Sequence, residues 1–185
     1  MKKRNVLIIG AGGIGSFMIP LLDKVNLYDI TVYDPDIVEL KNITYQNFTK
    51  VDIEKKKVDA MAERYDINPN PYPILTAGQL QGYDLVVCCA DNLDIRRTMY
   101  NSDVKWLDLR AQARGAAMIS HLEDPKLYNV FTSGPDGSFS CQGDAWTGKP
   151  EGVNFMQVVI AGYGVQWMQR WFNGDYVEKH FKING

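Results

Sequence analysis

The chain has 185 residues, enough for one domain with a sizeable core, and 45% of them are hydrophobic, which excludes an intrinsically disordered protein. Acidic residues outnumber basic ones, and the formal net charge is −2 at pH 7. This balance argues against a protein that binds nucleic acid through general attraction to phosphates. We therefore expect a single globular domain over residues 1–185 and no nucleic-acid partner.

The first predicted elements are a strand, a helix and a second strand. Residues 5–9 form a short apolar run ended by glycine, which is typical of a strand buried on both faces. Residues 14–25 place apolar side chains at helical spacing, interrupted by Pro20, which can kink a helix. Residues 30–33 predict the second strand, which ends at Asp34-Pro35-Asp36.

Further helices and strands are predicted along the rest of the chain. They are a helix over residues 52–65, a strand over 85–90, a helix from Asp91-Asn92 to about residue 101, strands over 106–109 and 116–122, and a helix over 153–172. Residues 68–73 are turn-rich and lead towards a strand, and residues 123–151 are predicted as loops. Strands that alternate with helices predict a doubly wound α/β fold, with a mostly parallel, Rossmann-like sheet and helices on both faces.

Acidic residues follow the predicted strands at the points where these strands end. Asp34 and Asp36 come after the second strand, and Asp91 follows the strand over residues 85–90. Sheets of this kind bind ligands at the carboxyl ends of their strands. We therefore expect these three carboxylates to converge on one crevice.

A glycine-rich turn joins the first strand to the first helix. Gly10, Gly12 and Gly15 form the pattern GxGxxG, and Gly13 lies between them. Glycine lets the backbone turn tightly and approach a phosphate, and the helix N-terminus offers free N–H groups. Asp34 then ends the next strand, where a carboxylate can accept the hydroxyls of a ribose. The alternative is a turn that only connects strand to helix, and the motif by itself does not separate ATP from NAD or FAD.

The segments after the second strand distinguish between ATP and NAD or FAD as the expected ligand. Residues 34–46 read DPDIVELKNITYQ, residues 52–58 read DIEKKKV, and residues 90–96 read ADNLDIR. Together with the turn from Gly10 to Ser16, this ordered series resembles the ThiF, MoeB and HesA family of adenylating proteins, which are relatives of the ubiquitin-activating enzymes. The family pattern is GxGGxGS, then DxDxVexxNxxRQ, then DxGxxK, then a TDN-like motif followed by arginine. The resemblance runs from about residue 4 to about residue 101 and is looser beyond.

The resemblance implies a role for each matching residue. Asp34 would hold the ribose, Asn42 and Gln46 would line the phosphate path, and Lys57 would neutralise charge on the leaving pyrophosphate. Asp91 would hold Mg²⁺, a cation that binds through carboxylate and phosphate oxygens. The implied reaction joins the C-terminal carboxylate of a ubiquitin-like or sulfur-carrier protein to the α-phosphate of ATP, with pyrophosphate leaving. The resemblance also implies a homodimer or heterodimer.

Each of these roles has a simpler alternative. Lys57 ends a run of three lysines, and such a run is usually a solvated helix face. Asp91 could instead cap the following helix. Asp36, Asn42 and Gln46 could serve only to satisfy backbone groups of the loop that carries them.

The chain departs from the family pattern at two cationic positions. Tyr45 stands where the family has arginine, and the predicted first strand leaves no room for the N-terminal helix through which a partner subunit donates another arginine. Loss of such charges can cost orders of magnitude in rate at a transferring phosphoryl group. Candidate replacements are Arg96, Arg97, Arg110 and Arg114.

The cysteines give further expectations. The chain has three cysteines, two histidines and no CxxC pair, so we expect neither zinc nor a disulfide framework, in keeping with a reducing compartment. Cys141 lies in a predicted loop and is either a nucleophile that takes the acyl group as a thioester or a remnant of the family's zinc motif. The basic N-terminus precedes an apolar run too short for a signal peptide, and no stretch has the length of a membrane helix. We expect a cytoplasmic protein without a membrane partner.

Three functions remain in competition at this level. The leading hypothesis is an ATP-dependent adenylyltransferase that activates a ubiquitin-like or sulfur-carrier protein. The second is a catalytically impaired module of the same fold that binds a nucleotide or a partner, which Tyr45 favours. The third is an NAD- or FAD-dependent oxidoreductase, which only the glycine turn and Asp34 support.

Overall fold

A seven-stranded sheet organises the residues that the computed structural model describes, which are 2–132, 141–143 and 146–184. Its strands are β1 (Arg4–Ile9), β2 (Tyr28–Tyr33), β3 (Ile67–Asn70), β4 (Leu85–Cys88), β5 (Trp106–Gln112), β6 (Gly115–Ser120) and β7 (His180–Ile183). They lie in the order β3-β2-β1-β4-β5-β6-β7. The strands from β3 to β5 pair in parallel, and β6 and β7 add two antiparallel strands at one edge. The predicted mostly parallel, doubly wound α/β fold is therefore confirmed.

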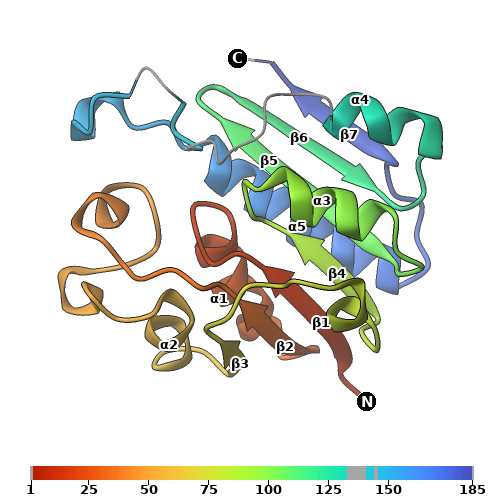
Figure 1. Ribbon diagram of the computed structural model, residues 1–185, viewed down its shortest axis with the longest axis horizontal. Coiled ribbons are helices and arrows are strands. Elements are labelled where there is room, and N and C mark those ends of the chain that lie inside the picture. The colour runs from red at the N-terminus through yellow and green to blue at the C-terminus, as the bar shows by residue number, and fades with distance from the viewer. Residues whose placement is uncertain (1, 133–140, 144–145, 185) are drawn as a thin grey trace.

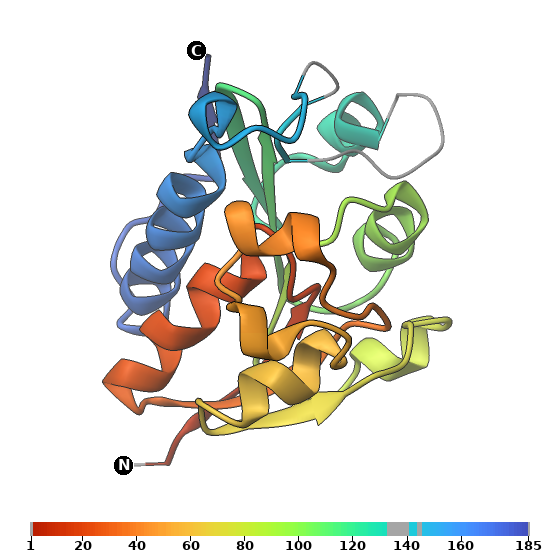
Figure 2. The ribbon, with the colours of Figure 1, turned by 90° about the vertical axis from the view of Figure 1, so that its left-hand side faces the viewer.

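Helices cover both faces of this sheet. They are α1 (Gly15–Val25), α2 (Lys57–Ala62), α3 (Leu93–Tyr100), α4 (Tyr128–Thr132) and α5 (Met156–Phe172). Five 3-10 turns join them, at Leu40–Thr44, Lys50–Asp52, Ala77–Leu80, Pro125–Leu127 and Pro150–Gly152. Figure 1 shows α3 in front of the sheet and α5 behind it, and Figure 2 shows α1 and α5 together on one side with α3 and α4 on the other. Within the described residues, no helix is both long enough and apolar enough to cross a membrane.

The central strand explains why the sheet needs two layers of helices. Val6, Leu7 and Ile8 of β1 are fully buried, so side chains on both faces of the strand are covered. Val6 and Ile8 belong to the apolar cluster under α1 and α5, and Leu7 belongs to the cluster under α3. Because both faces of β1 are covered, each of its central positions carries an apolar side chain, and this produces the unbroken apolar run in the sequence.

Strand order places a ligand crevice at β1 and β4. The chain moves outward from β1 to β2 and β3, then returns to pair β4 on the other side of β1. The carboxyl ends of neighbouring strands diverge at such a reversal and leave room between their loops. The glycine turn after β1 and Asp91 after β4 both lie at this point.

The predicted helix over residues 52–65 was too long. Only Lys57–Ala62 is α-helical, because residues 54–56 run antiparallel to residues 37–38. The Val38 N–H donates to the Lys55 carbonyl (2.9 Å), and the Glu54 N–H donates to the Val38 carbonyl (2.9 Å). These bonds hold the segment extended, and Glu54 takes a positive φ of 71° at its start.

Two strands and a short helix were missed in the sequence. β3 overlaps the turn-rich segment over residues 68–73 and contains Pro69, which an edge strand tolerates because its outer N–H groups have no ladder partner. β7 is a four-residue strand after α5, where the ring of Phe181 stacks on Tyr163 with centroids 4.5 Å apart. α4 lies in the stretch predicted as loops.

Candidate functional site

A cleft of about 1330 Å³ opens at the carboxyl ends of the parallel strands. Nearly all residues that the motifs selected line it, namely Gly10, Gly12, Gly13, Asp34, Asp36, Asn42, Gln46, Lys57, Asp91 and Cys141. Gly15 lies beneath the turn. The cleft exceeds the 300–1,000 Å³ usual for a single small ligand, so it has room for a nucleotide and part of a second molecule. The three aspartates that follow strands therefore share one crevice.

The glycine turn combines tight packing with open space. A Cβ at Gly15 would lie 1.9 Å from the Gly10 carbonyl oxygen, so only glycine lets α1 begin this close to the turn. At Gly12 the nearest atom to such a Cβ is Gln46 Nε2, 3.9 Å away. No side chain caps the N-terminus of α1, and its first turn holds no acidic residue. The open turn and the uncapped helix start suit an anion.

Asp34 ties the end of β2 to this turn. Its Oδ2 accepts a hydrogen bond from the Ala11 N–H (2.7 Å), and its Oδ1 accepts one from the Asp36 N–H (2.8 Å). Burial raises the pKa of Asp34, although Lys57 and the two N–H donors act against this rise. Each carboxylate oxygen has a second lone pair, so the group keeps capacity for ribose hydroxyls.

Lys57 lies in the cleft wall and not on a solvated helix face. It is 7% exposed, and its Nζ donates to Asp36 Oδ2 at 2.8 Å. Burial alone would lower the pKa of Lys57, but the carboxylates of Asp34 and Asp36 outweigh it and raise the pKa above its ordinary value. The Lys57 N–H also donates to the Asp36 carbonyl (3.0 Å), which continues the antiparallel pairing of this segment. A charged ammonium is therefore held beside the predicted ribose ligand.

Asn42 and Gln46 differ in what they do within their loop. Asn42 Oδ1 accepts from the Glu39 N–H (2.9 Å), and its Nδ2 donates to the Tyr45 hydroxyl (3.4 Å), so Asn42 does satisfy its own loop. Gln46 lies against Gly12, and its buried Oε1 has no hydrogen-bond partner among the described residues. Gln46 is thus the better placed of the two to contact a phosphate.

Asp91 is exposed at the cleft and is not the cap of α3. That role belongs to Asn92, whose Oδ1 accepts from the Asp94 N–H (2.7 Å) and from the Ile95 N–H (3.4 Å). The described part of the chain holds no group of three or more His, Cys, Asp or Glu side chains that could enclose a metal. Mg²⁺ is usually held by one or two carboxylates, waters and substrate phosphates, and a single carboxylate at Asp91 fits that chemistry.

Tyr45 fills the position of the family's arginine with a packed, uncharged ring. It is 8% exposed and lies edge-on to Trp146 with ring centroids 5.1 Å apart. Its carbonyl accepts from Nε2 of Gln157, a fully buried side chain at the start of α5. The aromatic pair and α5 therefore hold the loop that carries Tyr45. At this position the loop contributes no positive charge to the cleft.

Cys141 packs directly on the glycine turn. A Cβ placed at Gly13 would lie 2.4 Å from Cys141 Sγ. Burial raises the pKa of the Cys141 thiol to about 11. A nucleophilic cysteine needs a lowered pKa, so this environment favours a packing role.

A second charged cluster, which sequence reasoning missed, lies under α3. Asp108 is fully buried and accepts from Arg96 Nε (3.0 Å), from Arg110 Nε (2.9 Å) and Nη2 (2.7 Å), and from the Tyr100 hydroxyl. Arg110 Nη2 also donates to the Tyr100 oxygen (2.9 Å). Burial would raise the pKa of Asp108, but the two guanidinium groups outweigh it and lower that pKa. We call these four residues the Asp108 cluster.

The cluster decides which of the candidate arginines reach the cleft. Arg96 and Arg110 line it, whereas Arg97 and Arg114 are not among its lining residues. Arg97 Nη1 instead donates to Asp94 on the outside of α3 (3.1 Å). A sequence signal for the cluster exists, because Asp108 and Arg110 alternate with leucines and so share one face of β5.

Comparison with known proteins agrees with the motif series. Residues 1–106 match the model of the ThiF family. The chain is 25% identical over 196 residues to ubiquitin-like modifier-activating enzyme 5 of Bombyx mori, covering 90% of this chain and 50% of that protein. It is 34% identical over 103 residues to adenylyltransferase and sulfurtransferase UBA4 of Candida glabrata, covering 49% of this chain and 24% of that one. The chain thus spans half or less of the length of these curated relatives.

Among solved structures, the fold is similar to that of E. coli MccB crystallised with ATP. The TM-score is 0.69 at 16% sequence identity, and the similarity covers 100% of this chain and 61% of that chain. At this identity the likeness concerns the fold alone.

Proposed function

The chain belongs to the ThiF family, as its motif series predicted, and we propose that it is an adenylating enzyme that activates the C-terminal carboxylate of a ubiquitin-like or sulfur-carrier protein with ATP. One observation carries the proposal. The glycine turn, Asp34, Lys57 and Asp91 come from four separate segments of the chain and line one cleft. The two relatives are named as an activating enzyme and an adenylyltransferase, which supports the same class of reaction.

In this proposal the nucleotide lies along the carboxyl ends of β2, β1 and β4. Asp34 accepts the ribose hydroxyls, and the phosphates lie over Gly12 and the N-terminus of α1. Lys57 exchanges its contact with Asp36 for a phosphate oxygen. Asp36 is 64% exposed at its side chain, so water can solvate the carboxylate that this exchange releases.

The chemistry is in-line transfer at the α-phosphorus. An oxygen of the acyl carboxylate forms a bond to that phosphorus, the bridging bond to the β-phosphate breaks, and pyrophosphate leaves with the electron pair. Once it contacts the phosphates, Lys57 stabilises the negative charge that grows on the leaving group. Mg²⁺, where bound at Asp91, would supply further charge neutralisation on the phosphates.

Calorimetry on the wild-type chain tests the nucleotide half of the proposal. We expect MgATP to bind in preference to NAD, because Lys57 and Asp91 in the cleft offer contacts to a triphosphate and its Mg²⁺. Asp91→Ala should weaken MgATP binding. The matched control is Asp94→Ala, since Asp94 lies outside the cleft and pairs with Arg97. Binding of NAD without ATP would contradict the proposal.

A non-catalytic binding module is the second candidate, and Tyr45 is the observation that favours it. The arginine of the family pattern is replaced by a buried, neutral ring. A module of this kind would bind MgATP as tightly as an enzyme but would exchange no pyrophosphate into it. Measuring both MgATP binding and pyrophosphate exchange into ATP therefore distinguishes the binding module from the enzyme.

A further inference from the structure

The cleft extends well beyond the elements that would hold a nucleotide. The glycine turn, Asp34 and Lys57 all lie on the β1 and β2 side of β4. On the other side the lining continues along β5, β6 and β7 through Arg110, Gln112, Ala117 and Lys182. Two strand spacings, about 10 Å, separate β1 from β5, so a group held at β5 lies past the phosphates that the glycine turn would bind.

An acyl substrate that reaches this end of the cleft meets an electrostatic difficulty. Its terminal carboxylate must approach an ATP that carries several negative charges. Lys57 lies on the far side and contacts Asp36. Tyr45, at the family's arginine position, offers no charge. A cation on the β5 side would reduce the repulsion.

The Asp108 cluster places one cation at that wall. Arg110 lines the cleft with 23% of its side chain exposed, against 8% for Arg96 in the same cluster. Its Nε and Nη2 contact Asp108, and Nη2 also contacts Tyr100. Two contacts to a buried carboxylate and one to a phenol hold the guanidinium in one orientation at the wall. The cluster contains two guanidinium groups and one carboxylate, so it carries a net positive charge that attracts a carboxylate.

We propose that Arg110 binds the terminal carboxylate of the acyl substrate, and that Asp108 and Tyr100 are positioning residues that hold its guanidinium at the cleft wall. The inference rests on the proposed function, because it presupposes an acyl carboxylate beside a bound nucleotide. It assigns to Arg110 on β5 a positive charge that the family pattern places at the position of Tyr45.

The experiment uses the full chain loaded with Mg²⁺ and the α,β-methylene analogue of ATP, which cannot release pyrophosphate. Tetraglycine with a free C-terminus and tetraglycine with a C-terminal amide are then titrated by calorimetry. Wild type should prefer the free acid by at least about tenfold, the scale of one charge-assisted contact. Arg110→Gln should reduce this preference to within about twofold and leave affinity for the analogue unchanged. Arg97→Gln, the control outside the cleft, should behave as wild type.

Two milder variants keep the test decisive if Arg110→Gln does not fold. Arg110→Lys keeps the charge but loses the paired contacts to Asp108 that position it, and Tyr100→Phe removes only one positioning hydroxyl, so each should lower the preference for the free acid without abolishing it. An undiminished preference in the Arg110 variants, or equal affinity of wild type for the two peptides, would overturn the inference while analogue binding still supports the proposed function. Failure of wild type to bind the analogue would overturn both.

Discussion

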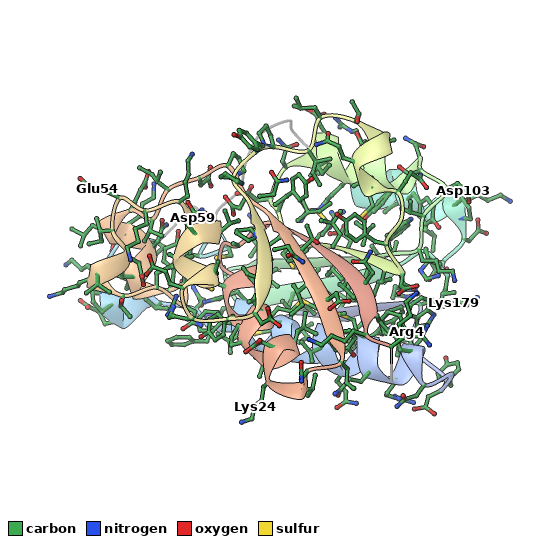
Figure 3. The ribbon with its side chains drawn as sticks, turned by 90° about the horizontal axis from the view of Figure 1, so that it is seen from below. Arg4, Lys24, Glu54, Asp59, Asp103 and Lys179 are labelled. Atoms are coloured by element: carbon green, nitrogen blue, oxygen red, sulfur yellow. The ribbon has the colours of Figure 1, made fainter. Side chains whose placement is uncertain are left out.

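Two charged clusters line opposite ends of the cleft, and their compositions are inverted. At the β2 end, two carboxylates, Asp34 and Asp36, share one cation, Lys57, and Asp36 is 64% exposed at its side chain. At the β5 end, Arg96 and Arg110 share one fully buried carboxylate, Asp108. Figure 3 shows the labelled Asp59 of α2 on one side of the molecule and the labelled Asp103, which follows α3, on the other. The exposed Asp36 can release Lys57 to a ligand, whereas the buried Asp108 supports the fold and holds Arg110 in place.

The largest expected effect breaks the buried cluster. Asp108→Asn should lower the free energy of unfolding by about 3–5 kcal/mol, because two guanidinium groups lose their carboxylate in a buried site. Asp36→Asn, at the other end, should cost less, because Lys57 keeps the neighbouring carboxylate of Asp34 and the asparagine oxygen can still accept its hydrogen bond. Urea denaturation of both variants measures the difference. Equal losses would show that burial does not distinguish the two clusters.

The next effect concerns ligand binding at the β2 end. Lys57→Gln should weaken MgATP binding by about 10- to 100-fold, since it removes a hydrogen bond between charged groups worth about 1.5–3 kcal/mol. The matched control is Lys56→Gln, because Lys56 donates to the Pro35 carbonyl and is not among the lining residues. Calorimetry should find the control within about twofold of wild type. If the Lys57 variant binds MgATP as tightly as the control does, Lys57 has no role in nucleotide binding.

Acid titration sharpens the comparison, because the two ends shift carboxylate pKa values in opposite directions. The pKa of Asp108 is lowered in the folded state, so its stabilisation is complete above about pH 3.9, the unfolded value, and is lost as the pH falls below it. The pKa of Asp34 is raised, so its charged form costs stability as the pH rises above about 3.9.

Urea midpoints between about pH 2.5 and pH 6 separate these contributions. Relative to wild type, Asp108→Asn should lose stability as the pH rises through the range below 3.9, the unfolded value of aspartate. Asp34→Asn should gain stability, relative to wild type, in the range above it. Slopes of the same sign in the two variants would contradict the assigned shifts.

The smallest effect is expected at the middle of the cleft. Cys141 has a pKa raised to about 11, so its thiol is almost wholly protonated at neutral pH. Cys141→Ala should change adenylate formation by less than about twofold, and iodoacetamide should label Cys141 far more slowly than free cysteine, whose pKa is about 8.5. Rapid labelling together with a trapped thioester would restore the nucleophile hypothesis.

The same contrast separates what sequence could predict from what it could not. The turn from Gly10 to Gly15 and Asp34 follow from local rules, since each depends on residues within a few positions of a strand end. The motifs also selected Lys57, although the helix predicted around it was too long. Sequence alone does not show that residues 54–56 pair with residues 37–38, because that pairing replaces helical bonds with bonds to a distant segment.

The Asp108 cluster could not be predicted from the sequence for a similar reason. It joins α3 to β5 through side chains whose meeting depends on how the helix packs on the sheet. The alternation of Asp108 and Arg110 with leucines places both on one face of β5, but only the packing shows that α3 covers that face. β7 escaped prediction because four residues carry too little periodicity, and it gains its pairing from β6.

Exchange of labelled pyrophosphate into ATP tests the central claim most directly. The assay combines the wild-type chain, Mg²⁺ and a panel of purified ubiquitin-like and sulfur-carrier proteins, each with its free C-terminus and with that carboxylate amidated. The account predicts exchange that requires a free C-terminal carboxylate and that Lys57→Gln and Asp91→Ala both reduce. Tight MgATP binding with no exchange across the whole panel would contradict adenylation and leave a nucleotide-binding module in its place.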